Sequence, residues 1–197
     1  MRSRQERKIA HKNLTRRDCL KLGVLGAAGI LLPMEVLAGD TESSAEERFL
    51  SFFNTHTGEH LNKAVFWAEG RFIPETLDEI NHLLRDHRTD SVYPIDPALL
   101  TLLHSLKREL PSYSQFHVIS GYRSPETNKM LNRQSNGGVA TYSLHMDGKA
   151  IDLRVPGCGL SKLRKTALAL KRGGVGYYPG SDFVHIDSGR VRWWTGS

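Results

Sequence analysis

Three side chains of this 197-residue chain combine types that hold a metal ion with positions that are costly for stability alone. They are His145, Asp152 and His185, and the last two each stand between apolar residues of an expected strand. A carboxylate buried in a strand needs a donor, a cation or a metal, because an unpaired buried charge is expensive. Two imidazoles and one carboxylate form a zinc set that leaves one position open for water, as catalysis requires. Each residue alone is more often a hydrogen-bonded core residue, so the hypothesis depends on the three together.

These residues belong to a longer pattern with fixed spacing. Its members are Ser143, His145, Gly148, Ala150 and Asp152, then Asp182 and His185, with Ser-Gly-Tyr-Arg-Ser upstream at residues 120–124. The pattern resembles the zinc peptidases that act on D-alanyl or related bonds of peptidoglycan, a family that shares its fold with the hedgehog signalling domain. Within that family, residues 118–124, 173–179 and 183–189 resemble the MepK-like murein endopeptidases, which cleave crosslinks between two diaminopimelate residues.

The resemblance implies a function and a cofactor. His145, Asp152 and His185 would hold Zn²⁺, which would lower the pKa of its water from 15.7 toward about 7 and polarise the scissile carbonyl. The substrate would be the peptide stems of peptidoglycan, with diaminopimelate–diaminopimelate (3-3) crosslinks as the leading choice. A D-Ala carboxypeptidase or D,D-endopeptidase is an alternative, and so is a non-catalytic, zinc-bearing wall-binding module.

Hydrolysis also needs a carboxylate that takes the proton of the attacking water and passes it to the leaving amine. The family places an acid three residues before the second His, which here is Asp182. Asp187 shares the strand face of His185 by alternation, whereas Asp182 has the opposite parity and must act from the preceding turn. We therefore predict Asp182 as the base, with Asp187 as the alternative base or as a partner that orients a His.

Two further residues gain roles from the resemblance. Arg123 resembles the family arginine that stabilises the oxyanion or grips a substrate carboxylate, tasks that suit a fixed guanidinium. Ser143 resembles the family serine beside the first ligand and would contact the substrate. Arg123 could instead form a structural ion pair, and Ser143 could instead be a plain turn residue. Four aromatic residues could line a groove or pack in the core, namely Tyr177, Tyr178, Trp193 and Trp194.

The order of expected elements predicts an α+β fold, a largely antiparallel sheet with flanking helices. The resemblance makes it hedgehog/D-Ala-D-Ala peptidase-like. Period-two patterns and turn residues predict strands over 49–53, 64–67, 116–119, 149–155, 175–178 and 183–187. Apolar residues at helical spacing and opening prolines predict helices over 74–88, 97–110, 125–133 and 161–172.

Residues 1–38 have the pattern of a cleaved targeting signal, with Arg16 and Arg17 before the apolar run 22–32 and a small-residue site at 36–38. The paired arginines indicate a twin-arginine signal and delivery to the periplasm. Cys19 stands where that signal usually has Phe, so the general secretion route stays open, as does an uncleaved anchor. Residues 39–48 are expected to form a flexible polar start and residues 49–197 a single zinc peptidase domain.

The basic charge of the chain lies mainly in that leader. Residues 1–38 hold eight Lys and Arg residues and three acidic residues, so they carry +5 of the formal net charge of +6. A sequence pI near 9.4 would otherwise suggest a nucleic-acid partner. Because the remaining chain is nearly neutral, we expect no nucleic-acid partner and, after signal cleavage, no stable membrane insertion.

Overall fold

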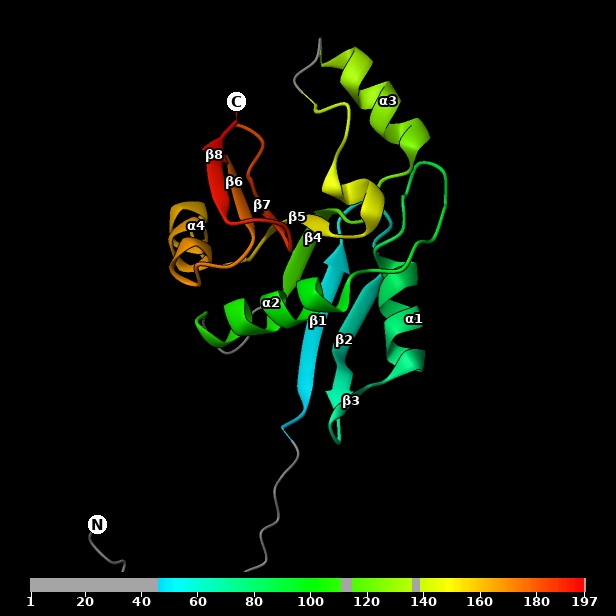
Figure 1. Ribbon diagram of the computed structural model, residues 1–197, viewed down its shortest axis with the longest axis vertical. Coiled ribbons are helices and arrows are strands. Elements are labelled where there is room, and N and C mark those ends of the chain that lie inside the picture. Colours follow the sequence, from blue (N-terminus) through cyan, green and yellow to red (C-terminus); the bar gives the residue numbers. More distant parts are fainter. Residues whose placement is uncertain (1–45, 111–114, 136–138, 197) are drawn as a thin grey trace, which may run out of the picture. The chain divides into compact units, whose positions relative to one another are not determined.

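Eight short strands build one mixed sheet on which the candidate ligands lie (Figure 1). The computed structural model describes residues 46–110, 115–135 and 139–196. The strands are β1 (Arg48–Asn54), β2 (His60–Ala68), β3 (Arg71–Phe72), β4 (Phe116–Ser120), β5 (Ala150–Arg154), β6 (Gly174–Tyr178), β7 (Phe183–Asp187) and β8 (Arg192–Thr195). Their order is β3-β2-β1-β4-β5-β7-β6-β8. All neighbours are antiparallel except β1 with β4 and β6 with β8, which confirms the predicted α+β class with a largely antiparallel sheet.

Four α-helices lie in the described part of the chain: α1 (Pro74–Leu83), α2 (Pro97–Arg108), α3 (Pro125–Gln134) and α4 (Leu160–Ala169). A short 3₁₀-helix, η2 (Leu144–Asp147), precedes β5. The predicted starts of α2 and α3 are confirmed, because Asp96 and Ser124 accept bonds from the free backbone N–H groups of Ala98 and Thr127. Proline follows each cap, where its missing N–H costs nothing.

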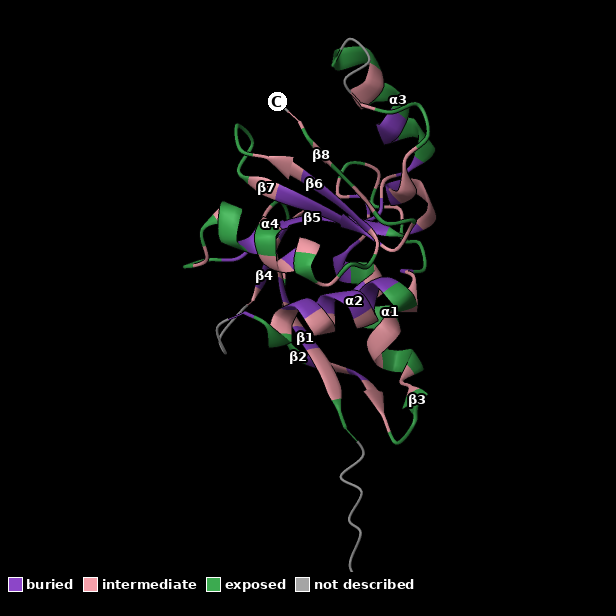
Figure 2. Cartoon of the chain, turned by 60° about the vertical axis from the view of Figure 1, so that its left-hand side comes forward, coloured by how far each residue is buried: buried purple, intermediate pink, exposed green. Residues whose placement is uncertain are grey.

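The main core lies where α2 crosses the sheet over β1, while α1 lies alongside β2 and α4 contacts β6 and β7 (Figure 1). Leucines at helical spacing on α2 meet aromatic side chains of three neighbouring strands. The fully buried members include Leu99, Leu103, Leu106, Phe52, Phe66 and Phe116. Figure 2 shows buried residues along the strands and exposed residues on the outer faces of the helices. Burying each such side chain contributes about 1.5–3 kcal/mol, which makes this core a rigid base for the site.

Several boundaries differ from the prediction. The first helix was expected to run from 74 to 88 but ends at Leu83, because the chain turns there to bring the Asp86 carboxylate against backbone N–H groups. The second strand is longer than 64–67 because it pairs with β1 from His60 onward. Strands β3 and β8 and the helix η2 were not predicted, since each is too short to show a period.

All of the described residues belong to one compact unit. Strand β1 begins at Arg48, the last residue of the expected polar start. The predicted signal 1–38 and residues 39–45 lie outside the described residues. Among the residues that are described, no helix has the length and hydropathy to cross a membrane.

The loop that carries Arg123 is held in place by hydrogen bonds from its backbone N–H groups. The Tyr122 N–H donates to the Leu84 carbonyl at 2.7 Å, and the Ser124 N–H donates to the Asp86 carboxylate at 2.9 Å. Position 121 requires glycine, because the Cβ of any other residue would clash with the Leu84 carbonyl oxygen. Asp86 is itself buried, and burial alone would raise its pKa. Hydrogen bonds from Thr127, Arg88 and Ser124 outweigh that effect and lower the pKa of Asp86 from 3.8 to about 2.

We expect Asp86→Asn to lower the free energy of unfolding by about 1–3 kcal/mol at pH 7, because backbone donors lose an ionised acceptor. A depressed pKa stabilises the fold above the unfolded value of 3.8, and this contribution is lost as pH falls through about 2. Urea unfolding from pH 7 down to pH 2 should therefore show the difference between wild type and variant shrinking below pH 4. Asp78→Asn is the control, since Asp78 is exposed on α1 and forms no ion pair or side-chain hydrogen bond within the described residues. A difference that stays constant with pH would contradict the assignment.

Candidate metal centre

Three elements bring His145, Asp152 and His185 to one point. Asp152 on β5 stands directly opposite His185 on β7 in the antiparallel register, so the two side chains share one face of the sheet. His145 comes from η2, whose N-cap Ser143 accepts from the His145 N–H. The His145 carbonyl in turn accepts from the Arg123 N–H at 3.1 Å. The sequence prediction that these residues meet is therefore consistent with the geometry.

The three side chains point their donor atoms at one another. Asp152 Oδ1 lies 2.8 Å from His185 Nδ1 and 3.3 Å from His145 Nε2. The two imidazole nitrogens, His145 Nε2 and His185 Nδ1, are 3.2 Å apart. All three residues are buried, with 2, 5 and 8% of the surface of His145, Asp152 and His185 exposed. Within residues 46–110, 115–135 and 139–196, this is the one group of three or more His, Cys, Asp or Glu that could hold a metal ion.

The second ring nitrogen of each imidazole, which faces away from Asp152, also has a hydrogen-bond partner. His145 Nδ1 lies 2.7 Å from the Gly121 carbonyl oxygen, which can only accept, so this nitrogen carries the proton. His185 Nε2 lies 3.1 Å from Asp187 Oδ2. With these outer contacts made, His145 Nε2 and His185 Nδ1 are the ring nitrogens that face Asp152 and that could bind a metal ion beside it. Such outer contacts fix the tautomer and the orientation of metal-binding imidazoles, so the donor set fits a metal ion.

Asp187 is held by more donors than any other carboxylate of the site. It is fully buried and accepts from the Gly174 N–H at 3.1 Å and the Gly189 N–H at 2.8 Å. Both Arg192 Nη atoms donate to it, at 3.0 and 2.7 Å. Burial would raise the pKa of Asp187, but hydrogen bonds with His185 and Arg192 outweigh it and hold the pKa below its usual range. Asp187 is therefore an ionised partner of His185, on the strand face that the alternation predicts.

The residues of the cluster shift one another's pKa values. Burial would raise the pKa of Asp152, yet the two imidazoles beside it lower the pKa below its ordinary value. Burial lowers the pKa of His145, which favours the neutral ring that binds metal. Burial also acts to lower the pKa of His185, but bonds to Asp152 and Asp187 outweigh it and raise the pKa. The carboxylates of Asp152 and Asp187 thus stay ionised although they are buried.

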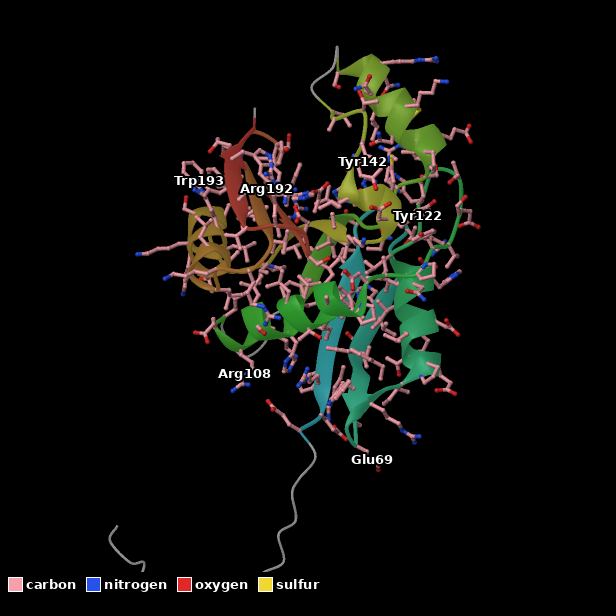
Figure 3. All side chains as sticks on the ribbon, viewed as in Figure 1. Glu69, Arg108, Tyr122, Tyr142, Arg192 and Trp193 are labelled. Carbon is pink, nitrogen blue, oxygen red and sulfur yellow. The ribbon has the colours of Figure 1, made fainter. Side chains whose placement is uncertain are left out.

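A cavity of about 500 Å³ opens onto the cluster. Tyr142 and Ser143 line it on the side of η2, while Tyr178, Trp194 and Arg192 line it on the side of β6 and β8. In Figure 3 the labelled Tyr142 and Arg192 lie on these two sides, and Trp193 lies on the outer side of β8. The cavity can therefore admit a substrate segment between an aromatic wall and the loop before η2.

The aromatic wall is tightly built. The Trp194 indole lies flat against Gly176, where an added Cβ would be 2.7 Å from the ring. Its Nε1–H donates to the Tyr178 hydroxyl at 2.9 Å, and its ring centre is 5.2 Å from that of His185. Tyr178 stacks on Phe183 with ring centres 4.6 Å apart. Of the two alternatives left open for the aromatic residues, lining a cavity rather than packing in the core is what the structure shows for Tyr178 and Trp194.

Arg123 lies in the cavity wall next to the Asp152 carboxylate. Its Nη2 is 3.5 Å from Asp152 Oδ2 and 3.5 Å from Ser120 Oγ, and its Nη1 is 3.4 Å from Asn128 Oδ1. These are long bonds, and its buried Nε has no partner among the described residues. Burial lowers the pKa of Arg123, partly offset by the charge of Asp152. A buried guanidinium with spare donors can accept an anionic group of a substrate.

Asp182 lies apart from the cluster. It occupies the turn before β7, with a left-handed φ of 55°, and its side chain is 65% exposed. Its carboxylate accepts from Arg154 at 2.9 Å and does not line the cavity. The structure therefore brings Arg123 and Ser143 to the predicted site and Asp187 to His185, while Asp182 is held at the surface. Its role as base stays a prediction.

Sequence reasoning named Trp194 as a possible cavity residue but missed strand β8 itself and Arg192, which β8 places beside Trp194 at the cavity. The available signal was their spacing, since residues two apart in a strand share a face. The spacing alone does not show that residues 192–195 form a strand, which becomes clear only from their pairing with β6.

Comparison with known proteins identifies the class, an M15-type peptidase. The family description that matches residues 42–194 is that of peptidoglycan L,D-endopeptidase MepK. The chain is 42% identical over 179 residues to peptidoglycan L,D-endopeptidase MepK of Escherichia coli strain K12, covering 91% of this chain and 96% of that protein. It is also 42% identical over 182 residues to the probable peptidoglycan L,D-endopeptidase MepK of Haemophilus influenzae, covering 92% and 96%. The chain therefore belongs to the MepK family, which confirms the resemblance found in the sequence.

We expect Asp187→Asn to weaken zinc binding about 10- to 100-fold. An amide can donate to His185 Nε2, which would shift the ring proton onto Nδ1 and remove the lone pair that binds metal. Competition with a chromogenic chelator measures this affinity directly. Asp182→Asn is the matched control and should leave the affinity unchanged, because Asp182 contacts Arg154 instead. Equal affinities for wild type and Asp187→Asn would contradict the proposed role of Asp187.

Proposed function

We propose that this protein is a zinc-dependent murein endopeptidase that hydrolyses diaminopimelate–diaminopimelate (3-3) crosslinks in peptidoglycan. The observation that carries the proposal is the convergence of His145 Nε2, Asp152 Oδ1 and His185 Nδ1 at a cavity. The names of the relatives, peptidoglycan L,D-endopeptidases, support the substrate class. We also propose that the α+β fold is the one shared by the hedgehog domain and D-Ala-D-Ala peptidases.

Zinc is the metal that this donor set suits. Two imidazole nitrogens and one carboxylate oxygen leave a fourth position open, which is the pattern of catalytic zinc sites. When bound there, zinc supplies Lewis acidity and a nucleophilic water at neutral pH. The protein supplies the orientation, because the Gly121 carbonyl and Asp187 fix the two imidazoles. Asp152 is aligned by the register of β5 with β7.

Arg123 and Ser143 are proposed to act on the substrate. The Arg123 guanidinium has a buried Nε without a partner in the described residues and lies beside Asp152. It can therefore donate to a substrate carboxylate or to the oxyanion of the scissile bond. Ser143 lines the cavity and caps η2, so a substrate bond from its hydroxyl would be coupled to the position of His145.

Asp182 remains the proposed general base, and the role requires its bond to Arg154 to open. The side chains of Asp182 and Arg154 are 65% and 41% exposed, and ion pairs at the surface contribute about 0–1 kcal/mol. Opening is therefore inexpensive. Asp187 is the alternative, but its oxygens already accept from two backbone N–H groups and from Arg192. That arrangement favours an orienting role for Asp187 over proton transfer.

Purified crosslinked muropeptides test the reaction and its base together. We expect the zinc-loaded protein to split 3-3 crosslinked dimers into monomers, and a chelator to stop the release. Asp182→Ala should lower kcat about 10²- to 10⁴-fold, whereas Arg154→Ala, which frees the Asp182 carboxylate, should not. Mass spectrometry of the products separates the alternatives, since a carboxypeptidase would release only terminal D-Ala.

Two results would count against these assignments. If wild type with zinc releases nothing from sacculi or muropeptides, the enzyme proposal fails and a wall-binding module remains. If Asp182→Ala and Asp187→Ala both keep full activity, neither carboxylate is the base.

The proposed site of action is the periplasm, reached by the twin-arginine route that residues 1–38 suggest. That route carries folded proteins, and a zinc site formed in the cytoplasm would add folding free energy there. We expect replacement of both Arg16 and Arg17 by Lys to abolish delivery, as measured by immunoblots of periplasmic and cytoplasmic fractions. Unchanged periplasmic delivery of that variant would exclude the twin-arginine route.

A further inference from the structure

The Tyr178 hydroxyl is a polar group in the cavity wall that the proposed mechanism does not use. Tyr178 is the last residue of β6, and it lines the cavity together with Arg123 and the three candidate metal ligands. Its neighbour Tyr177 has the same side chain and a different environment. The Tyr177 hydroxyl lies 3.1 Å from Ser161 Oγ at the start of α4 and does not line the cavity.

The bond from Trp194 determines what the Tyr178 hydroxyl can do. An indole N–H can only donate, so the 2.9 Å contact from Trp194 Nε1 makes the Tyr178 oxygen the acceptor. The phenolic proton is therefore left for a different partner. In the part of the chain that the structure describes, no protein acceptor for this proton is found. A donor of this kind at a cavity is available to a bound substrate.

The hydroxyl is also held in place. The Tyr178 ring stacks on Phe183, and the Trp194 indole that fixes its oxygen packs against the His185 ring, 5.2 Å away between ring centres. Arg192 covers the indole, with its guanidinium carbon 5.0 Å from the ring centre. Arg123 lines the same cavity. The phenol thus belongs to the same cavity wall as His185 and Arg123.

We propose that Tyr178 is a further catalytic residue, whose O–H donates a hydrogen bond to the oxyanion that forms on the scissile carbonyl. This inference rests on the proposed function. Attack by water forms a C–O bond and moves the carbonyl π electrons onto oxygen. Collapse of the tetrahedral intermediate returns that electron pair and breaks the C–N bond, while the base delivers the water proton to the leaving amine. The phenolic proton stays on Tyr178 throughout.

A neutral donor suits this position. Arg123 and Arg192 already place two cations in the wall, and a further buried cation would add repulsion and a desolvation cost. A phenol donates a hydrogen bond without carrying charge. The removal of one preorganised oxyanion donor typically lowers kcat about 10²- to 10³-fold.

Tyr178→Phe tests the proposal because it removes the hydroxyl and keeps the ring. We expect kcat on 3-3 crosslinked muropeptides to fall about 10²- to 10³-fold, with KM and zinc affinity unchanged. A phosphinate analogue of the crosslink, which mimics the tetrahedral intermediate, should bind the variant more weakly by a similar factor. Tyr177→Phe is the matched control, and we expect it to behave as wild type in all of these measurements.

Three outcomes would overturn the proposal: Tyr178→Phe behaving like Tyr177→Phe, KM rising with kcat unchanged, or zinc affinity falling with activity. The second would mean that the hydroxyl binds the ground state, and the third that it only supports the metal site. Failure of the underlying function gives a different result, because wild type itself would then release no product while still binding zinc.

Discussion

The register between β5 and β7 is the constraint on which the site depends. It places Asp152 directly opposite His185, and a slip by one residue would turn one of these side chains to the other face of the sheet. The register is well determined because Ile151 and Leu153 alternate with Asp152 and are fully buried. Core packing on one face thus fixes the chemistry on the other. Only then can η2 add His145 as the third donor.

A second layer of contacts keeps these polar groups from being unpaired. The series from Arg192 through Asp187 to His185 runs from β8 to the cluster, and the Gly121 carbonyl serves His145 in the same way. Burial of this many charges is stabilising only when every member has a partner. The Ser-Gly-Tyr-Arg-Ser loop supplies both the Gly121 carbonyl and Arg123. It therefore connects the metal ligands to the group proposed to bind the substrate.

The sequence predicted those parts of the site that residue type, motif spacing and strand alternation are enough to identify. His145, Asp152 and His185 combine chemistry and spacing, and strand alternation was enough to place Asp187 beside His185. The fold class followed from the order of short apolar segments. The predictions failed where a partner lies far along the chain. The first helix ends early because of Asp86, whose partner Ser124 is 38 residues away. Arg192 acts through a strand of four residues that has no period of its own.

The position of Asp182 shows the same limit. Its motif position predicts a base, but the surface bond to Arg154, 28 residues away, depends on how two turns meet in space. Likewise, the environment of Tyr178 depends on a bond from Trp194 on a neighbouring parallel strand. Local patterns identify which residues can do chemistry, while long-range pairing decides which of their atoms are free to do it.

The central claim is that His145, Asp152 and His185 hold one zinc ion through defined atoms. Crystals of the zinc-loaded protein, measured on both sides of the zinc absorption edge, test it most directly. The account predicts one anomalous peak bonded to His145 Nε2, Asp152 and His185 Nδ1, with Zn–N distances of about 2.0–2.1 Å and Asp187 still bonded to His185 Nε2. A zinc ion bound elsewhere, or bound through His185 Nε2 with Asp187 displaced, would contradict it.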